Sequence, residues 1–184
     1  MMTSVGPAEN FRKIPKIFEK ISIDSIEIMT TGRIELGASG RAVAANVKRL
    51  RADRGWSLRT LSEALDAVGR KLSQDAINKI ENGAKPDAKQ IRRVDVDDLV
   101  ALSVVFNVNP SALLLPFTDA PGDVVEVTAV GEVGAEKAWD WVDGEMPIGD
   151  VQPGDPTGAI LQFQYYARPA GRRLQLGVGG GSDG

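Results

Sequence analysis

The chain of 184 residues contains neither cysteine nor histidine. Without cysteine it forms no disulfide, no thiolate metal site and no cysteine nucleophile. Without histidine it lacks the usual general base, the usual zinc ligand and the centre of a Ser-His-Asp triad. Asp140, Asp143 and Glu145 form an acidic cluster, but they match no catalytic motif and are interpreted as a solvated face. We therefore expect a protein that is not an enzyme and that uses no cofactor or metal.

Long apolar runs are missing as well. No segment approaches the roughly 18 consecutive apolar residues that are needed to span a bilayer. The N-terminal segment lacks the pattern of a secretory signal, because its apolar residues are interrupted by Glu9, Arg12, Lys13, Lys16 and Glu19. Hydrophobic residues make up 42% of the chain, which is enough to build a core. We expect a cytoplasmic protein with no membrane partner.

Positively charged residues are scarce at the C-terminal end of the chain and abundant in its middle. Residues 41 to 93 contain 13 Lys and Arg against 6 Asp and Glu, whereas residues 117 to 184 contain 4 against 11. The net charge of −3 hides this asymmetry. A basic block beside an acidic one is typical of a domain that meets a polyanion, although a solvated basic surface gives the same count.

The hydrophobic pattern divides the chain into three parts. In residues 1 to 39, alternating isoleucines at 21 to 28 predict a strand, so this part is an arm or an extra strand. Residues 40 to 116 have a helical period and predict five helices, of which the third ends at Gly83 in a left-handed conformation. The residues that delimit these helices are Gly55, Ser57, Gly69, Ser73, Gly83, either Asp95 or Asp97, and Asn109 with Pro110.

The third part, residues 117 to 184, is a small acidic segment that contains β-structure. Residues 123 to 133 and 160 to 167 predict strands, residues 135 to 142 predict a helical turn, and the glycine-rich tail from residue 177 is expected to be disordered. The helical turn presents Trp139 and Trp141. These tryptophans and the aromatic residues at 163 to 166 fit the core of this segment, a dimer interface or a second DNA contact.

Two strings in the second part carry a specific resemblance. Residues 57 to 65 read Ser-Leu-Arg-Thr-Leu-Ser-Glu-Ala-Leu, and residues 72 to 83 read Leu-Ser-Gln-Asp-Ala-Ile-Asn-Lys-Ile-Glu-Asn-Gly. Together with residues 97 to 102 and 106 to 114, they resemble the Cro/repressor (Xre) helix-turn-helix family, in particular regulators of actinobacteria and their temperate phages. The resemblance covers residues 41 to 116. Two segments are longer than the family's usual ones, the connection at 66 to 72 and the loop at 84 to 93.

The resemblance implies a mainly α protein with a five-helix, lambda-repressor-like bundle and a small C-terminal α+β appendage. Its helix at 73 to 82 would enter the DNA major groove. Side chains of the types found there can hydrogen-bond to base edges, and flanking cations can contact phosphates. The predicted base-contacting residues are Ser73, Gln74, Asp75 and Asn78, and the predicted phosphate-contacting residues are Arg59, Arg70, Lys71 and Lys79.

Several of these residues have a second interpretation. Asp75 also fits a first-turn residue that the helix dipole favours. The basic loop at 84 to 93 is either a wing on the DNA backbone or a solvated loop. Glu81 is expected to pair with an arginine of the domain, and Trp56 is expected to lie in the core.

The function that follows is a sequence-specific transcriptional regulator, a repressor of phage or host genes, that binds a double-stranded DNA operator. Typical members of the family bind as homodimers. The alternative is an antitoxin or adaptor that binds DNA through the same motif and a protein partner through residues 117 to 184.

Overall fold

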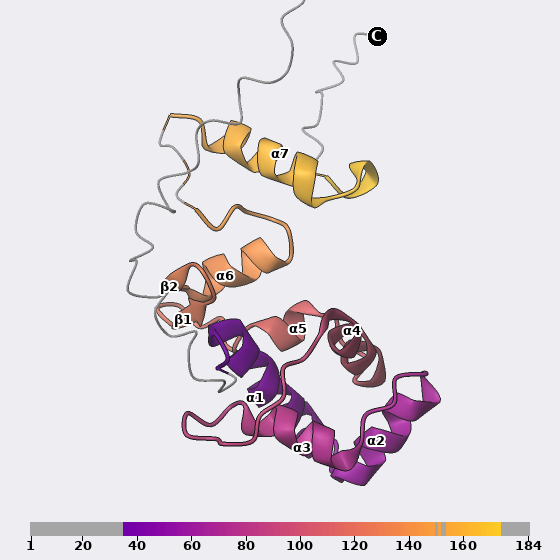
Figure 1. Ribbon diagram of the computed structural model, residues 1–184. Coiled ribbons are helices and arrows are strands. Elements are labelled where there is room, and N and C mark those ends of the chain that lie inside the picture. The colour runs from indigo at the N-terminus through magenta and orange to yellow at the C-terminus, as the bar shows by residue number, and fades with distance from the viewer. Residues whose placement is uncertain (1–34, 150, 152–153, 174–184) are drawn as a thin grey trace, which may run out of the picture. The chain divides into compact units, whose positions relative to one another are not determined.

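The computed structural model describes residues 35–149, 151 and 154–173. The chain divides into two units, Met1–Arg33 and Ile34–Gly184, and every described residue belongs to the second. The described residues form seven α-helices and one two-stranded sheet, so the protein is mainly α as predicted (Figure 1). The strand predicted at 21 to 28 and the tail from residue 177 lie outside the described residues. None of the described helices has the length and apolar character that crossing a membrane requires.

Five helices occupy the part of the chain where five were predicted. They are α1 (Ala38–Asp53), α2 (Leu58–Ala67), α3 (Gln74–Asn82), α4 (Val96–Val105) and α5 (Ser111–Leu114). The side chains of Ser57, Ser73 and Asp95 each accept a hydrogen bond from a backbone N–H in the first turn of the following helix. Such caps satisfy N–H groups that have no partner inside the helix. Asp95, and not Asp97, is therefore the residue that starts α4.

The apolar stripes of these helices meet in one core. Leu61 and Leu65 of α2 pack with Ile77 and Ile80 of α3, and Phe106 at the C-terminal end of α4 belongs to the same core. Trp56 is partly buried against this core, and its ring stacks on Phe106 with 6.1 Å between the ring centroids. The prediction that Trp56 is a core residue is confirmed.

Glycines end the first two helices as predicted, but Gly83 behaves differently. Gly55 and Gly69 have φ angles of +64° and +81°, which favour glycine. Gly83 has a φ of −59° and is right-handed, so the predicted left-handed conformation is wrong. A Cβ atom at position 83 would lie 2.5 Å from Leu36 Cδ1 and 3.0 Å from the Ile80 carbonyl oxygen. Glycine is favoured here because Leu36 and the Ile80 carbonyl leave little room for a side chain at position 83.

The segment after α5 begins with a hairpin. The single strand predicted at 123 to 133 is in fact two, β1 (Val124–Val127) and β2 (Gly131–Gly134), which pair antiparallel with Val125 opposite Val133. The chain reverses through Ala129, whose φ is +67°, and Gly131, whose φ is +87°. The alternation of apolar and polar residues continues across this turn, so the sequence pattern predicted one continuous strand and not a hairpin.

The predicted helical turn at 135 to 142 is confirmed as α6 (Ala135–Val142). It packs on β1 in a second apolar cluster that contains Leu115, Val125, Val127, Ala135 and Ala138. Trp139 and Trp141 are partly buried against this cluster, and Trp139 Nε1 donates to the Thr118 carbonyl at 2.9 Å. The tryptophans therefore belong to the core of the segment. The two clusters adjoin at Leu114 and Leu115, close to the predicted domain boundary, which itself stays a prediction.

The strand predicted at 160 to 167 is wrong, because these residues lie in helix α7 (Pro156–Ala167). A short apolar and aromatic run does not distinguish a strand from a helix by its period. The start signals were present: Asp155 accepts from Gly158 N at 2.8 Å, and Pro156 occupies the first turn. A short 3₁₀ helix, Ala170–Arg172, follows. Gln164 Nε2 donates to the Glu145 carbonyl, which joins α7 to the segment after α6.

Candidate nucleic-acid interface

Helices α2 and α3 pack together and leave one side of α3 open (Figure 1). Ile77, Ile80 and Glu81 are the buried residues of α3. Gln74 and Asn78, four residues apart and therefore neighbours on the helix surface, are exposed. The other two predicted base-contacting residues, Ser73 and Asp75, are exposed as well. The structure thus brings all four together at the N-terminal half of α3.

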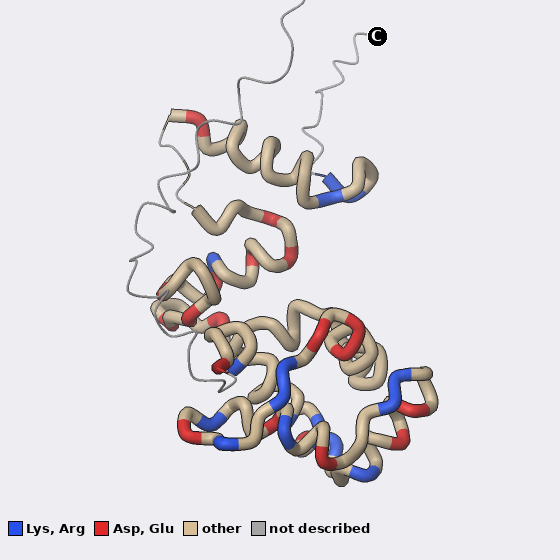
Figure 2. Tube along the Cα trace, viewed as in Figure 1, with Lys and Arg blue, Asp and Glu red and all other residues tan. Residues whose placement is uncertain are grey.

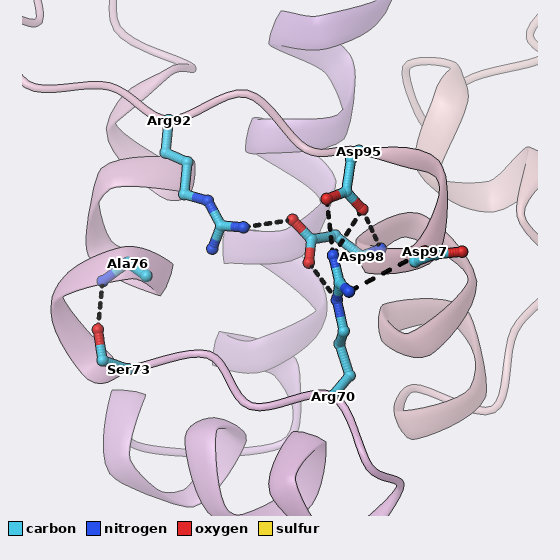
Figure 3. Close-up of polar contacts among 7 residues, drawn as sticks. All are labelled: Arg70, Ser73, Ala76, Arg92, Asp95, Asp97 and Asp98. Carbon is cyan, nitrogen blue, oxygen red and sulfur yellow. Dashed lines mark hydrogen bonds and ion pairs between the residues drawn. The ribbon is translucent and has the colours of Figure 1, made fainter.

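Ser73 has a structural role in addition to its exposed position. Its Oγ accepts a hydrogen bond from Ala76 N at 3.1 Å, which caps α3 (Figure 3). Beside this start of α3 lies a hollow of about 450 Å³ that is also lined by Ser62, Lys71 and Arg92. Glu63 and Asp66 line this hollow as well, so the start of α3 borders a concave surface of mixed charge.

Asp75 and Lys79 form an ion pair along α3, with 2.7 Å between Oδ2 and Nζ. Their positions also suit the helix dipole, since Asp75 lies in the first turn and Lys79 in the last. The interpretation of Asp75 as a helix-stabilising residue is supported by this pair. Its exposed carboxylate stays a candidate for base contact.

The four predicted phosphate contacts fall into two groups. Arg59 and Lys71 are exposed, and Lys79 is half-buried. Arg59 pairs with Glu63 at 2.8 Å, and the hydrogen bond to this carboxylate raises the pKa of Arg59. Lys71 lies two residues before Ser73, Lys79 lies in the last turn of α3, and Arg59 lies in α2. Figure 2 shows basic positions along α2, α3 and the loop at 84 to 93, with acidic positions interleaved.

Arg70 forms the second group, because its guanidinium is directed at carboxylates of the protein itself. Nε donates to Asp98 Oδ1 at 2.7 Å, and Nη2 donates to both carboxylate oxygens of Asp95 at 2.8 and 2.6 Å (Figure 3). The hydrogen bond to Asp98, followed by the charges of Asp98, Asp95 and Asp97, raises the pKa of Arg70. Arg70 is therefore held in ion pairs within the protein, and its predicted role as a phosphate contact stays a prediction.

Two residues of this network were missed by sequence reasoning. Asp98 is fully buried, and its second oxygen accepts from Arg92 Nη2 at 2.8 Å. Arg92 belongs to the loop at 84 to 93, which was predicted to be a basic wing or a solvated loop. An acid in the first turn of the predicted helix, directly after a basic loop, was the available signal in the sequence. The partners are 28 and 6 residues away from Asp98, so local spacing did not reveal them.

The two unusually long segments are both anchored. In the connection before α3, Leu72 is buried and its carbonyl accepts from Ser62 Oγ at 2.5 Å. In the loop after α3, Arg92 N donates to the Lys79 carbonyl at 3.1 Å, and Arg93 Nη2 donates to the Glu35 carbonyl. Lys85 and Lys89 of this loop are exposed. They are the residues that a basic wing would use.

Glu81 pairs with Arg51 of α1, and this confirms the expected arginine partner. Arg51 Nε and Nη2 donate to the two carboxylate oxygens of Glu81 at 2.6 and 2.8 Å. Arg51 Nη1 also donates to the Trp56 carbonyl at 2.7 Å. The hydrogen bond to Glu81 raises the pKa of Arg51. The C-terminal end of α3 is thereby fixed to α1.

Comparison of the chain with protein-family models, with curated proteins and with solved structures gave no match.

The cap of α4 makes stability sensitive to acid. The hydrogen bond from Asp98 N, followed by the charges of Arg70 and Arg92, lowers the pKa of Asp95. A carboxyl with a lowered pKa in the folded state stabilises the fold above its unfolded pKa of about 4, and this contribution is lost as pH falls through the folded value. We expect Asp95→Asn, whose side chain can still cap α4, to have a lower melting temperature than the wild type at pH 6. The difference between the two melting temperatures should be smaller at pH 3. Thermal unfolding followed by circular dichroism measures this difference in melting temperature. An equal difference at both pH values would contradict the role of the carboxylate charge.

Proposed function

We propose that this chain is a sequence-specific, double-stranded DNA-binding transcriptional regulator that acts as a repressor. In this proposal α1 to α5 are a lambda-repressor-like DNA-binding bundle, and α3 reads the major groove. The observation that carries it is the exposed amide pair of Gln74 and Asn78 at the N-terminal half of a helix whose other side is locked into the core.

The chemistry of this pair suits base recognition. The major groove of B-DNA admits one α-helix, and adenine presents N7 as an acceptor and N6 as a donor there. A carboxamide carries one donor and one acceptor side by side, so Gln74 and Asn78 can each form two hydrogen bonds with an adenine. Because α2 packs across α3, α3 is presented as the second helix of a two-helix motif, and in such motifs its N-terminal residues contact bases.

The flanking cations supply the backbone contacts of the proposal. Lys71 is exposed, whereas Arg59 and Lys79 would exchange Glu63 and Asp75 for phosphates. Surface pairs of this i, i+4 kind contribute little to stability, so the exchange costs little. Arg70 is left out because its partners include a fully buried carboxylate.

Exposed aromatic residues of α7 suit contact with a protein partner. The exposed Tyr165 and Tyr166 of α7 are the described residues through which a second copy of the chain, or the protein partner of an antitoxin or adaptor, would be contacted. Aromatic side chains are frequent anchors of such interfaces.

Binding should weaken steeply with salt. Each phosphate that a Lys or Arg neutralises contributes about −0.9 to the slope of log K against log salt concentration, so Arg59, Lys71 and Lys79 together give about −3. Lys71→Ala should reduce the magnitude of this slope by about 1. Fluorescence anisotropy with a duplex enriched by the protein from random sequences measures it.

The matched control for this salt titration is Arg172→Ala, which removes an exposed cation outside the proposed interface. It should leave the slope unchanged. A slope near zero for the wild type, or equal slopes for the two variants, would overturn the assignment of Lys71 to a phosphate.

A further inference from the structure

One buried carboxylate holds the chain on both sides of α3. Asp98 Oδ1 accepts from Arg70 Nε at 2.7 Å, and Asp98 Oδ2 accepts from Arg92 Nη2 at 2.8 Å. Arg70 belongs to the connection that leads into α3, whereas Arg92 belongs to the loop that leaves it. Figure 3 shows both guanidinium groups converging on Asp98 from different segments. The arrangement is a clamp, which we define as Arg70, Arg92, Asp95 and Asp98.

Because Asp98 is buried, the two arginines of the clamp cannot easily leave it. Removing a carboxylate from water costs several kcal/mol unless charged hydrogen bonds compensate. Asp98 is fully buried, and each of its oxygens has an arginine partner. Moving either arginine away would leave part of this buried charge without a partner. The positions of the two flanking segments are therefore coupled through Asp98 to the first turn of α4.

The rest of the packing around the N-terminal half of α3 is thin. Between residues 73 and 78, Ile77 is the buried side chain. The C-terminal half has Ile80 in the core and the Arg51–Glu81 pair to α1. Helices this short are not stable on their own and take their orientation from tertiary contacts. At the end of α3 that carries Gln74 and Asn78, Ile77 and the buried Leu72 just before the helix pack into the core, and the clamp fixes the connection at Arg70, three residues before Ser73.

We propose that Asp98 is a positioning residue for DNA recognition, which sets the orientation in which α3 presents Gln74 and Asn78 without touching DNA. This inference rests on the proposed function. Hydrogen bonds to base edges require accurate placement, whereas phosphate contacts tolerate displacement because they are long-range and independent of sequence. Losing the clamp therefore lowers discrimination between sequences more than it lowers affinity for DNA in general.

The test compares Asp98→Asn with Asp97→Asn in the full chain. Both remove one carboxylate charge from the same turn, but the Asp97 side chain is 84% exposed and lies 4.0 Å from Arg70. We expect Asp98→Asn to reduce the affinity ratio between the enriched duplex and a scrambled duplex about tenfold, the loss of roughly one base contact. We expect Asp97→Asn to leave the ratio unchanged. An unchanged ratio in Asp98→Asn would overturn the inference.

A double-mutant cycle separates positioning from a general loss of structure. If Asp98 acts through α3, Asp98→Asn should lower the affinity ratio less in a Gln74→Ala background, because the misplaced contact is already gone. Additive losses would contradict this. Should Asp98→Asn prove unfolded by circular dichroism, Arg92→Gln removes one arm of the clamp and should lower the ratio in the same direction. An unchanged ratio in that variant would equally overturn the inference.

Hydrogen exchange in the DNA-free protein distinguishes failure of the clamp from failure of the proposed function. The backbone amides of α3 should exchange faster in Asp98→Asn than in Asp97→Asn, relative to those of α1. Equal exchange would refute the clamp whether or not the chain binds DNA. A wild type that does not discriminate between duplexes, with faster exchange in Asp98→Asn, would refute the proposed function and with it the role of Asp98 in recognition.

Discussion

Replacing Glu81 with alanine is expected to lower the free energy of unfolding by about 3 kcal/mol, because it leaves a partly buried arginine without its carboxylate. The Glu81 side chain is 7% exposed, and both of its oxygens accept from Arg51. The same arginine donates to the Trp56 carbonyl, so its displacement would also disturb the turn between α1 and α2. Urea unfolding followed by circular dichroism measures the change.

The control for Glu81 is Glu63→Ala. Glu63 also accepts from an arginine, at 2.8 Å, but both partners are exposed and lie four residues apart on α2. Exposed pairs of this kind contribute little to stability, because water and salt screen them. The account therefore requires a large difference between two variants that lose the same type of side chain and the same type of ion pair. Similar losses of stability in the two variants would show that burial of the Arg51–Glu81 pair does not matter.

The second large effect is expected on DNA affinity. The double substitution Gln74→Ala with Asn78→Ala should weaken binding to the enriched duplex by about 1–3 kcal/mol for each amide that contacts a base. Neither amide carries charge, so affinity for a scrambled duplex should stay the same, and so should the salt slope. Competition binding with both duplexes at one salt concentration measures the two affinities together.

Gln162→Ala is the matched control for this pair of amides, because it removes an exposed carboxamide from α7. It should change neither affinity. If the α3 double variant still prefers the enriched duplex as strongly as the wild type does, Gln74 and Asn78 are not base-contacting residues.

The sequence predicted the five helices well because their signals are local. Ser57 and Ser73 cap the next turn through their own side chains, and the buried leucines and isoleucines recur at helical spacing. Exposure of Gln74 and Asn78 followed from the same period, since residues off the apolar stripe face outward. The partner type of Glu81 was predicted as well, although the particular arginine depends on how α1 crosses α3.

The features that the sequence did not reveal depend on contacts between distant residues. Arg70 looked like a free cation beside α3, because its partners, Asp95 and Asp98, follow 25 and 28 residues later. Gly83 looked like a left-handed helix end, whereas its constraint is the approach of Leu36 from before α1. In both cases a residue with a familiar local role is determined by a neighbour that only the tertiary fold supplies.

Helix α7 shows a different limit. Residues 160 to 167 contain aromatic and branched apolar side chains in a short run, which suits a strand as well as a helix. The cap at Asp155 and the proline at 156 decide in favour of the helix, but they lie in a segment rich in proline and glycine, a composition that is typical of linkers. Strong start signals can therefore be hidden by the composition around them.

Selection of bound sites from random double-stranded DNA tests the central claim most directly. It should be run with the full-length wild type and with the Gln74→Ala, Asn78→Ala variant, side by side at about 0.15 M ionic strength. We expect the wild type to enrich one motif, palindromic for a dimer or asymmetric for a monomer, and the variant to lose preference at one or two A·T positions of that motif. No enrichment by the wild type, or the same motif enriched equally by both proteins, would contradict recognition of DNA by α3.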